Sequence, residues 1–312
     1  MVEIFFRTIP FFAIIGLGYW AGQAKFFSEE ATAYLTKFVF YFALSAMLFS
    51  FAANLSLSEV SDVNLIAGYL LGTIIVYGFV IFVSLLRRLD MANAAVEAQC
   101  AVIGNVGFLG IPMLAIIFGD AAIGPVLLVL AVDLIVFSSL IVILITVSRE
   151  GVMSLSILKT VGKGLISNPM IVAIVSGLLW SAMDIPIPRP MNDFLTILGA
   201  AATPGALFAI GASLASKSAV RFQVAAWLTF CKLIIHPIFV AIGVIFIFPI
   251  NSFSASVAIS AAALPVAGNV YILAQHYNVA PQRASAAILL STVASIITVS
   301  VAIALVSNMA IN

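Results

Sequence analysis

The tripeptide Gly-Asn-Val occurs twice in this chain, each time in the middle of a long apolar stretch. The two copies, each with a nearby proline, are Gly104-Asn105-Val106 with Pro112 and Gly268-Asn269-Val270 with Pro265. Glycine, asparagine and proline together in mid-span predict an unwound helix. Because the bilayer core has no water to satisfy freed backbone groups, such a break is tolerated only where it lines a cavity or is packed in protein.

Composition places the chain in a membrane. Of its 312 residues, 64% are hydrophobic and 8% are charged, whereas a soluble domain carries about 25% charged residues. The apolar stretches are long and do not resemble the roughly ten-residue alternating strands of an outer-membrane barrel. We therefore expect an all-α integral membrane protein in contact with the lipid bilayer. The net charge of +1 argues against a nucleic-acid partner.

Ten transmembrane helices fit the apolar pattern. They are expected near residues 4–24, 31–53, 64–86, 94–118, 122–147, 166–183, 194–215, 222–248, 254–276 and 282–307. The longest polar connection, 148–165, leaves five spans on each side, so the second half would run upside down relative to the first. This is a five-plus-five inverted repeat, and the Gly-Asn-Val copies break its matching spans 4 and 9. Paired breaks of this kind indicate the substrate site of a transporter.

The distribution of basic residues predicts the orientation. Connections after odd-numbered spans hold Lys25, Arg87, Arg88, Arg149, Lys159, Lys163, Lys217, Arg221 and Arg283. The remaining connections and the two tails hold only Arg7 and Arg189. The positive-inside rule places the first group in the cytoplasm, so both termini are expected outside.

Asn105 and Asn269 are the leading candidates for substrate binding. An asparagine amide both donates and accepts hydrogen bonds. The half-helix that begins after each break, at Val106 and near Gly268 and Val270, directs free N–H groups and its positive dipole end at the gap, which suits an anion. The alternative is that both asparagines only cap the broken helices.

Lys232, Asp133, His236 and Glu97 are the candidates for charge compensation or coupling, because an ionisable group inside a membrane costs about 2.5–3.5 kcal/mol. Lys232 and His236 are four residues apart and share one helix face. Lys232 could counter an anionic substrate or pair with Asp133 or Glu97, and Asp133 is equally a candidate ligand for an ion or a proton. Glu97 and Lys37 lie near span ends, where an interfacial position is expected.

The sequence contains no zinc-protease, serine-hydrolase or P-loop motif. The two histidines are far apart, without flanking residues of a metal site. We therefore expect no enzyme activity, no cofactor and no metal centre.

An ordered set of motifs resembles the auxin efflux carrier family, the bacterial relatives of the plant PIN transporters, over essentially the whole chain. The motifs are Ile15-Gly16-Leu17-Gly18-Tyr19, Gly104-Asn105-Val106-Gly107-Phe108-Leu109-Gly110-Ile111-Pro112, Asn168-Pro169, Pro204, Ile210-Gly211-Ala212-Ser213-Leu214, Lys232-Leu233-Ile234-Ile235-His236-Pro237 and Ala263-Leu264-Pro265.

The resemblance implies a fold like that of the bile-acid/sodium symporters. Spans 1, 2, 6 and 7 (residues 1–60 and 166–217) would form a scaffold domain. Spans 3–5 and 8–10 (residues 61–147 and 218–307) would form a transport core, with 148–165 as a cytoplasmic linker. Spans 4 and 9 would cross at their breaks, Pro112 belonging to the first crossover and Pro265 to the second.

The resemblance also implies a function. Family members carry small organic anions, such as auxin, malate or malonate, and the core would move as an elevator in the bacterial cytoplasmic (inner) membrane. Coupling to Na⁺ or H⁺ stays open, as does a homodimer through the scaffold domain. A passive channel is a further alternative from a different class, although a channel gains nothing from paired broken helices.

Overall fold

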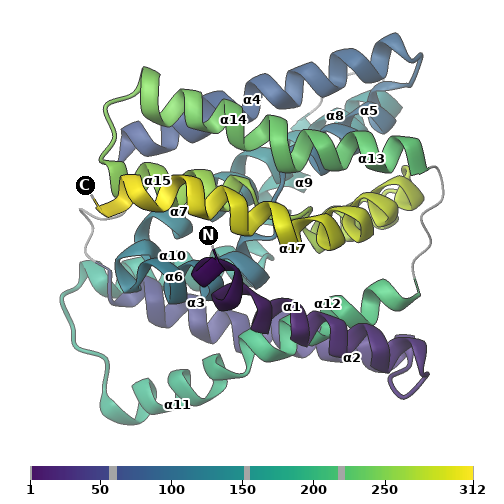
Figure 1. Ribbon diagram of the computed structural model, residues 1–312. Helices are drawn as coiled ribbons and strands as arrows, with labels where there is room; N and C mark the ends of the chain where they lie inside the picture. The colour runs from purple at the N-terminus through teal and green to yellow at the C-terminus, as the bar shows by residue number, and fades with distance from the viewer. Residues whose placement is uncertain (1, 56–61, 151–154, 217–221, 312) are drawn as a thin grey trace.

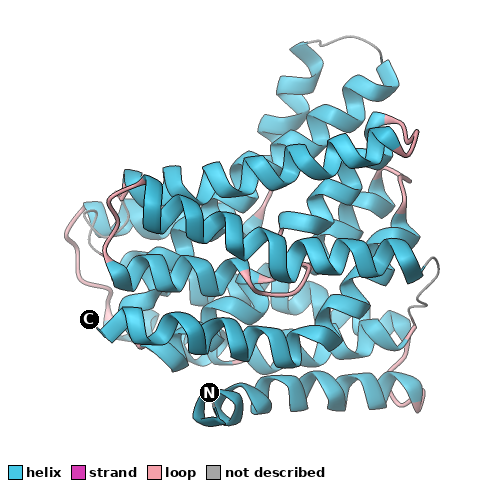
Figure 2. Ribbon diagram, turned by 45° about the horizontal axis from the view of Figure 1, so that its top comes forward, coloured by secondary structure: helices cyan, strands magenta, loops and turns pink. Residues whose placement is uncertain are grey.

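The computed structural model describes residues 2–55, 62–150, 155–216 and 222–311. The described residues form helices and connecting loops, with no strand (Figure 2). The α-helices are α1 (Val2–Gln23), α2 (Glu29–Phe38), α3 (Leu44–Ala53), α4 (Val63–Leu86), α5 (Met91–Val102), α6 (Ile111–Phe118), α7 (Ile123–Val132), α8 (Ser138–Glu150), α9 (Leu155–Ile166), α10 (Pro169–Ala182), α11 (Arg189–Ala200), α12 (Ala202–Ala215), α13 (Phe222–Phe230), α14 (His236–Ala241), α15 (Ser252–Ala262), α16 (Gly268–His276) and α17 (Pro281–Ile311). Short π turns are η1 (Val39–Ala43), η2 (Val106–Gly110), η4 (Asp133–Phe137), η5 (Cys231–Ile235) and η6 (Ile242–Ile247), and η3 (Asp120–Ala122) is a 3-10 turn.

Seven of the described helical runs are long and apolar enough to cross a membrane, and the bent pair α9 and α10 can supply an eighth. The chain is thus a multi-pass membrane protein, while the full set of ten spans stays a prediction. There is a physical reason why fewer than ten helices are long enough to span a membrane. The expected spans 4 and 9 are each divided by an extended segment, which leaves the shorter apolar helices Val106–Phe118 and Ser252–Ala262.

The connection expected at 148–165 is not simply a polar linker, because it contains a helix. Helix α8 continues to Glu150, residues 151–154 lie outside the described part, and α9 follows directly. Apolar residues at helical spacing, among them Leu158, Val161 and Leu165, explain why α9 forms despite its two lysines. The chain then bends by 66° into α10, where Asn168 Oδ1 accepts a hydrogen bond from the Met170 N–H at 3.0 Å.

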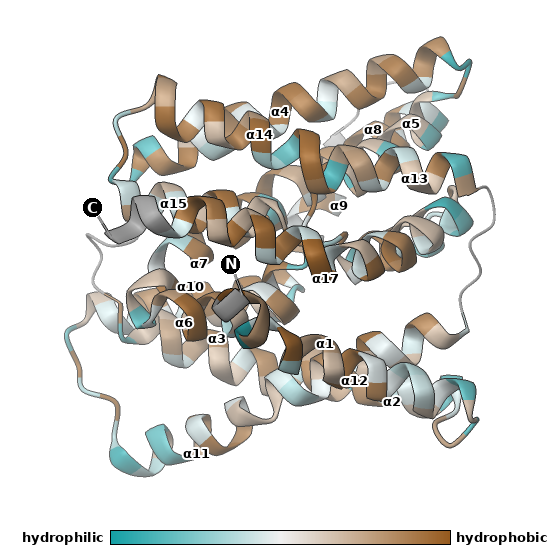
Figure 3. Ribbon diagram, viewed as in Figure 1, coloured by the Kyte–Doolittle hydropathy of each residue, from teal (hydrophilic) through white to brown (hydrophobic). Residues whose placement is uncertain are grey.

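The helix connections gather according to their place in the chain. Where α1 and α12 end, Gln23 Nε2 donates to the Ala215 carbonyl at 2.8 Å. Arg149, in the last turn of α8, donates to the carbonyl of Tyr277, which directly follows α16. At the other end of the molecule, Ser181 Oγ donates to the Leu55 carbonyl at 2.5 Å. The end of α1 thus lies beside that of α12, the end of α8 beside that of α16, and the end of α3 beside that of α10. Hydrophilic residues lie mostly at these helix ends (Figure 3). Lys217 and Arg221 lie outside the described residues.

Helix packing separates the molecule into two groups (Figure 1). Helix α1 packs along α12, and α3 packs along α10 and α11. In the other group α4 packs against α5 and α14, while α17 packs against α13 and α15. The groups touch chiefly where α1 meets α17 and where α12 meets η2. The boundaries expected near residues 60 and 217 lie outside the described residues.

Glycines allow α1 and α12 to approach closely. A Cβ atom at Gly18 would lie 2.1 Å from the Phe208 carbonyl oxygen, and one at Gly211 would lie 1.9 Å from the Ile15 carbonyl oxygen. Both distances are far below van der Waals contact, so no side chain fits without separating the helices. Small residues at such contacts are the usual way in which membrane helices associate, because lipid provides no hydrophobic drive between them.

We predict that Gly18→Ala lowers the free energy of unfolding by about 1–3 kcal/mol, since the new methyl group forces the two backbones apart. The matched control is Gly16→Ala on the same helix, where a Cβ meets nothing within 4 Å. That variant should change stability by no more than about 0.5 kcal/mol. Melting temperatures in detergent compare the two. Equal melting temperatures would contradict the packing described for α1 and α12.

Candidate functional site at the helix crossover

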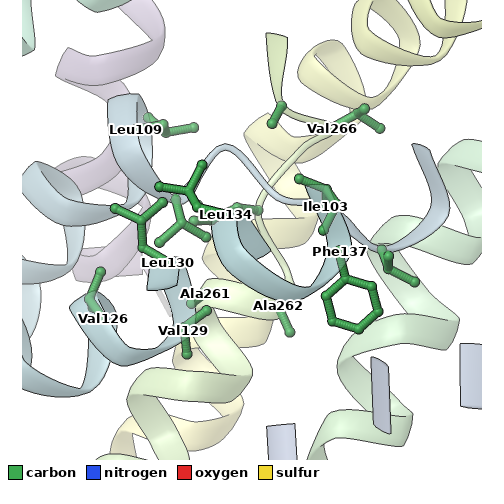
Figure 4. Packing of buried hydrophobic residues seen from close by; sticks show 14 of the residues in the cluster. Ile103, Leu109, Val126, Val129, Leu130, Leu134, Phe137, Ala261, Ala262 and Val266 are labelled. Atoms are coloured by element: carbon green, nitrogen blue, oxygen red, sulfur yellow. The ribbon is translucent and has the colours of Figure 1, made fainter. Parts of the chain in front are cut away.

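Two extended segments, residues 103–105 and 265–267, cross each other in antiparallel orientation (Figure 4). The Asn105 N–H donates to the Pro265 carbonyl at 2.8 Å, and the Ala267 N–H donates to the Ile103 carbonyl at 3.0 Å. Ile103 and Val266 are each 1% exposed. Each broken helix thus satisfies backbone groups that the other break has freed. This pairing is what makes the two interruptions tolerable away from water.

The residue types explain where the chain unwinds. Pro265 has no N–H to donate and disfavours a helical conformation at Leu264. Gly104 provides space, because a Cβ there would lie 3.2 Å from the Ala261 carbonyl oxygen and 3.4 Å from Lys232 Nζ. Pro112 lies beyond the break, in the first turn of α6. The π turn η2 precedes it, and such a turn accommodates a residue that lacks an N–H.

Helical structure resumes after each break with amides that lack partners. The N–H groups of Val106, Gly107 and Phe108 have no acceptor among the described residues, and those of Gly268 and Asn269 likewise have none. These are the positive ends of two half-helices, one on each side of the crossing. The Val270 N–H differs, because it donates to the Ala267 carbonyl at 3.2 Å.

Neither asparagine caps a helix. The backbone carbonyl of Asn105 accepts from the N–H groups of Leu109 and Gly110 at 3.1 and 2.9 Å, but its side chain makes no capping bond. Asn269 Oδ1 is buried and has no hydrogen-bond partner in the described structure. Since a buried amide oxygen without a partner costs free energy, the capping alternative does not explain the pair.

Behind the crossing lies a buried polar group. Lys232 and His236 are 0% exposed, and Asp133 is 2% exposed. Lys232 Nζ donates to the Ala262 carbonyl and lies 3.2 Å from His236 Nδ1. Asp133 Oδ1 instead accepts from the Tyr69 hydroxyl at 2.8 Å. The expectation that Lys232 could pair directly with Asp133 or Glu97 is therefore not met.

Sequence reasoning missed two members of this group, Tyr69 and Thr73. Thr73 Oγ1 donates to the Tyr69 carbonyl at 2.7 Å and lies 3.1 Å from His236 Nε2. Both residues are four positions apart on one face of α4, and both are fully packed inside the protein. The sequence signal that could have identified them is a pair of hydroxyl side chains four residues apart in an otherwise apolar helix.

Glu97 is packed inside the protein, next to arginines at the ends of α4 and α17, in a set of ion pairs that sequence reasoning did not foresee. It is 0% exposed, and its carboxylate binds Arg87 Nη1 at 2.8 Å and Arg283 Nη1 at 2.5 Å. Ser84 Oγ donates to it as well, at 2.8 Å. Glu97 lies in the second turn of α5, which begins at Met91. The two arginines reach it from the end of α4 and the beginning of α17. Lys37, by contrast, lies on the exposed face of α2.

No group of three or more His, Cys, Asp or Glu side chains that could hold a metal ion occurs in the described ranges. The polar groups near the crossing are amides, hydroxyls, one lysine, one histidine and one carboxylate. Their chemistry suits binding and charge compensation.

These features define a multi-pass integral membrane protein built around two interrupted helices that cross. The chain belongs to the membrane transport protein family, whose sequence profile matches residues 3–303. The resemblance to the auxin efflux carriers is thereby confirmed. A Rhizobium meliloti (strain 1021) protein named "Putative malonate transporter" is 27% identical over 307 residues, which are 96% of this chain and 95% of the relative. The Escherichia coli (strain K12) protein named "Uncharacterized transporter YfdV" is 26% identical over 306 residues, 93% of each chain.

We predict that Glu97→Gln lowers the free energy of unfolding by about 2 kcal/mol, because two arginines lose their shared anion. The value is below the roughly 3–5 kcal/mol expected for breaking a fully buried pair, since the Arg87 side chain is 35% exposed and remains hydrated. Asp193→Asn, at an exposed position of α11, serves as the control with the same change of charge. Thermal unfolding of the two variants side by side tests this. A Glu97→Gln protein as stable as the control would show that the arginines do not depend on Glu97.

Proposed function

We propose that this protein is a secondary transporter of small organic anions, most simply carboxylates, that works by alternating access. One observation carries the proposal. Two half-helix N-termini flank the crossing with unpaired amides, and the asparagine at each break keeps its side chain free of capping bonds. Unpaired N–H groups at a helix N-terminus bind anions, because the hydrogen bonds and the helix dipole favour negative charge together.

Binding would use both asparagines. The substrate carboxylate would accept hydrogen bonds from the amides at Val106 and Gly268 and from the side chains of Asn105 and Asn269. A hydrogen bond to a charged group contributes about 1.5–3 kcal/mol, so a few of them support recognition of a small ion. The name of the Rhizobium meliloti relative is consistent with a dicarboxylate such as malonate.

The packing supports a division into two moving parts. Helices α1, α2, α3, α10, α11 and α12 would form the scaffold, and the remaining spans would form the transport core. The half-helix that starts at η2 contacts α12 across the boundary, so the anion site would lie beside the surface along which the parts slide. An elevator motion of the core would then expose the crossing to either side in turn.

The distribution of charge supports an orientation. Connections rich in lysine and arginine gather at one end of the molecule, which we place in the cytoplasm, with both termini outside. The membrane would be the bacterial inner membrane.

Coupling to a cation is a second candidate, favoured by Asp133. Its Oδ2 atom is buried without a hydrogen-bond partner in the described structure, and an intramembrane carboxylate is a common proton or ion site. Uptake into vesicles under an imposed Na⁺ gradient and under an imposed proton gradient distinguishes coupled from uncoupled transport.

We predict that Asn105→Ala and Asn269→Ala each abolish uptake of the transported carboxylate and leave folding mostly intact. The alanine removes a ligand amide but no capping bond, so only binding should suffer. Radiolabelled uptake into proteoliposomes is the readout, after thermal-shift screening of malonate, malate and monocarboxylates has identified a stabilising ligand.

Asn192→Ala, at an exposed position of α11, is the matched control and should transport normally. Both crossover variants should also lose the ligand-induced rise in melting temperature. Normal uptake by Asn105→Ala would refute the assignment of this residue to the substrate site.

The elevator motion can be tested at a contact between the two groups of helices. The rings of Phe40 on η1 and Phe108 on η2 stack with centroids 6.4 Å apart. We predict that a Phe40→Cys/Phe108→Cys protein loses uptake when a bis-methanethiosulfonate reagent links the two thiols. Uptake should return after reduction.

Each single cysteine variant, treated in the same way, should keep its uptake, and the native Cys100 and Cys231 are both buried. Undiminished uptake by the fully linked double variant would exclude relative motion of η1 and η2 as a step of transport.

A further inference from the structure

We propose that the crossover contains a site for a small monovalent cation and that the Lys232 ammonium fills this site as a tethered ion. The proposal concerns the crossing itself and does not depend on which anion the protein carries. It assigns Lys232 a role different from both the substrate contact and the ion pair that the sequence suggested.

The first ligand of the ammonium is a carbonyl group released by the break. Ala262 is the last residue of α15, and the backbone N–H that would follow it one helical turn later, on Val266, donates instead to Ser291 Oγ at 3.1 Å. Lys232 Nζ donates to this free Ala262 carbonyl. Carbonyls at the C-terminal ends of broken helices carry the negative end of the helix dipole and coordinate cations in transporters. Here a side chain occupies that position.

The second ligand is a histidine held in one tautomer. Thr73 donates its hydroxyl hydrogen to the Tyr69 carbonyl, so its oxygen can accept from His236 Nε2, 3.1 Å away. In the tautomer with its proton on Nε2, His236 presents the lone pair of Nδ1 to Lys232 Nζ at 3.2 Å, and Nδ1 also lies 3.3 Å from the Ala262 carbonyl oxygen. A neutral histidine fixed as an acceptor is a ligand for a cation.

The surroundings fit a charge of one unit. The nearest part of span 4 is Gly104, where a Cβ would lie 3.4 Å from Nζ, so the absence of a side chain leaves room for the ammonium. The carboxylate of this buried group, Asp133, accepts from the Tyr69 hydroxyl at 2.8 Å through Oδ1, and its Oδ2 atom is buried without a hydrogen-bond partner in the described structure. The Ala262 carbonyl and His236 are neutral ligands, so the charge of one ammonium is compensated by the single carboxylate of this group, Asp133.

A consequence is that the crossing of the native protein needs no metal cation. Shortening residue 232 should empty the site while its ligands stay in place. The empty site should then accept a free cation that carries N–H donors and resembles the end of a lysine side chain.

The test is the thermal stability of purified Lys232→Ala in methylammonium chloride. We expect the variant to melt below the native protein and to recover by about 2–4 °C when methylammonium is well above its dissociation constant. Tetramethylammonium chloride at equal concentration supplies the same charge without N–H donors and should give no recovery. The native protein should respond equally to both salts.

Lys37→Ala, at an exposed position of α2, is the matched control and should show no selective recovery. A folded Lys232→Ala protein that gains nothing from methylammonium, or gains as much from tetramethylammonium, overturns the proposal. Loss of anion uptake by Asn105→Ala is a separate outcome, so failure of either idea leaves the other standing.

If Lys232→Ala does not fold, the native protein itself decides the matter. A site already filled by Lys232 predicts equal melting temperatures in sodium, methylammonium and tetramethylammonium chloride. Selective stabilisation of the native protein by sodium or methylammonium, lost in Gly104→Ala, would show an open cation site and refute the proposal.

Discussion

Backbone pairing between residues 103–105 and 265–267 is the interaction on which the rest of the structure depends. A helix interrupted in a membrane leaves N–H and C=O groups that neither lipid nor its own turns can satisfy. In this chain two interruptions meet, and each supplies donors and acceptors to the other. Neither break would be stable without its counterpart, because each would leave buried backbone groups without partners.

The pairing also separates the positive helix ends from the negative one. The half-helix N-termini with free amides begin at Val106 and Gly268, next to Asn105 and Asn269. A released carbonyl at the C-terminal end of α15 points to Lys232. Positive helix ends thus remain available for an anion, while a negative end is already neutralised by a side chain. This asymmetry explains how a site for anions can exist a short distance from a buried ammonium without the two functions competing for the same atoms.

Much of this arrangement is predictable from sequence, because Gly104, Pro265 and the two asparagines are chemically unusual in an apolar helix. The sequence does not predict the role of a residue whose partners lie far away in the chain. The ion pairs of Glu97 could not be foreseen because Arg283, its closest partner, is remote in the chain. Tyr69 and Thr73 looked like ordinary helix residues until His236 and Asp133 were placed beside them. Pro112 was expected to belong to the first break, but it lies in the first turn of α6, after the extended segment has ended. Sequence alone does not distinguish a proline that unwinds a helix from one that follows a π turn within it. Helix α9 was hidden by its lysines within a connection that looked polar.

The two arginines on Glu97 have a mechanical consequence. Arg87 follows α4, Arg283 begins α17, and Glu97 belongs to α5, so one carboxylate ties the beginning of the first broken helix to elements from both halves of the sequence. A load applied to any of these helices is passed to the other two through the buried carboxylate of Glu97. Any displacement of α5 would therefore draw the adjoining ends of α4 and α17 with it.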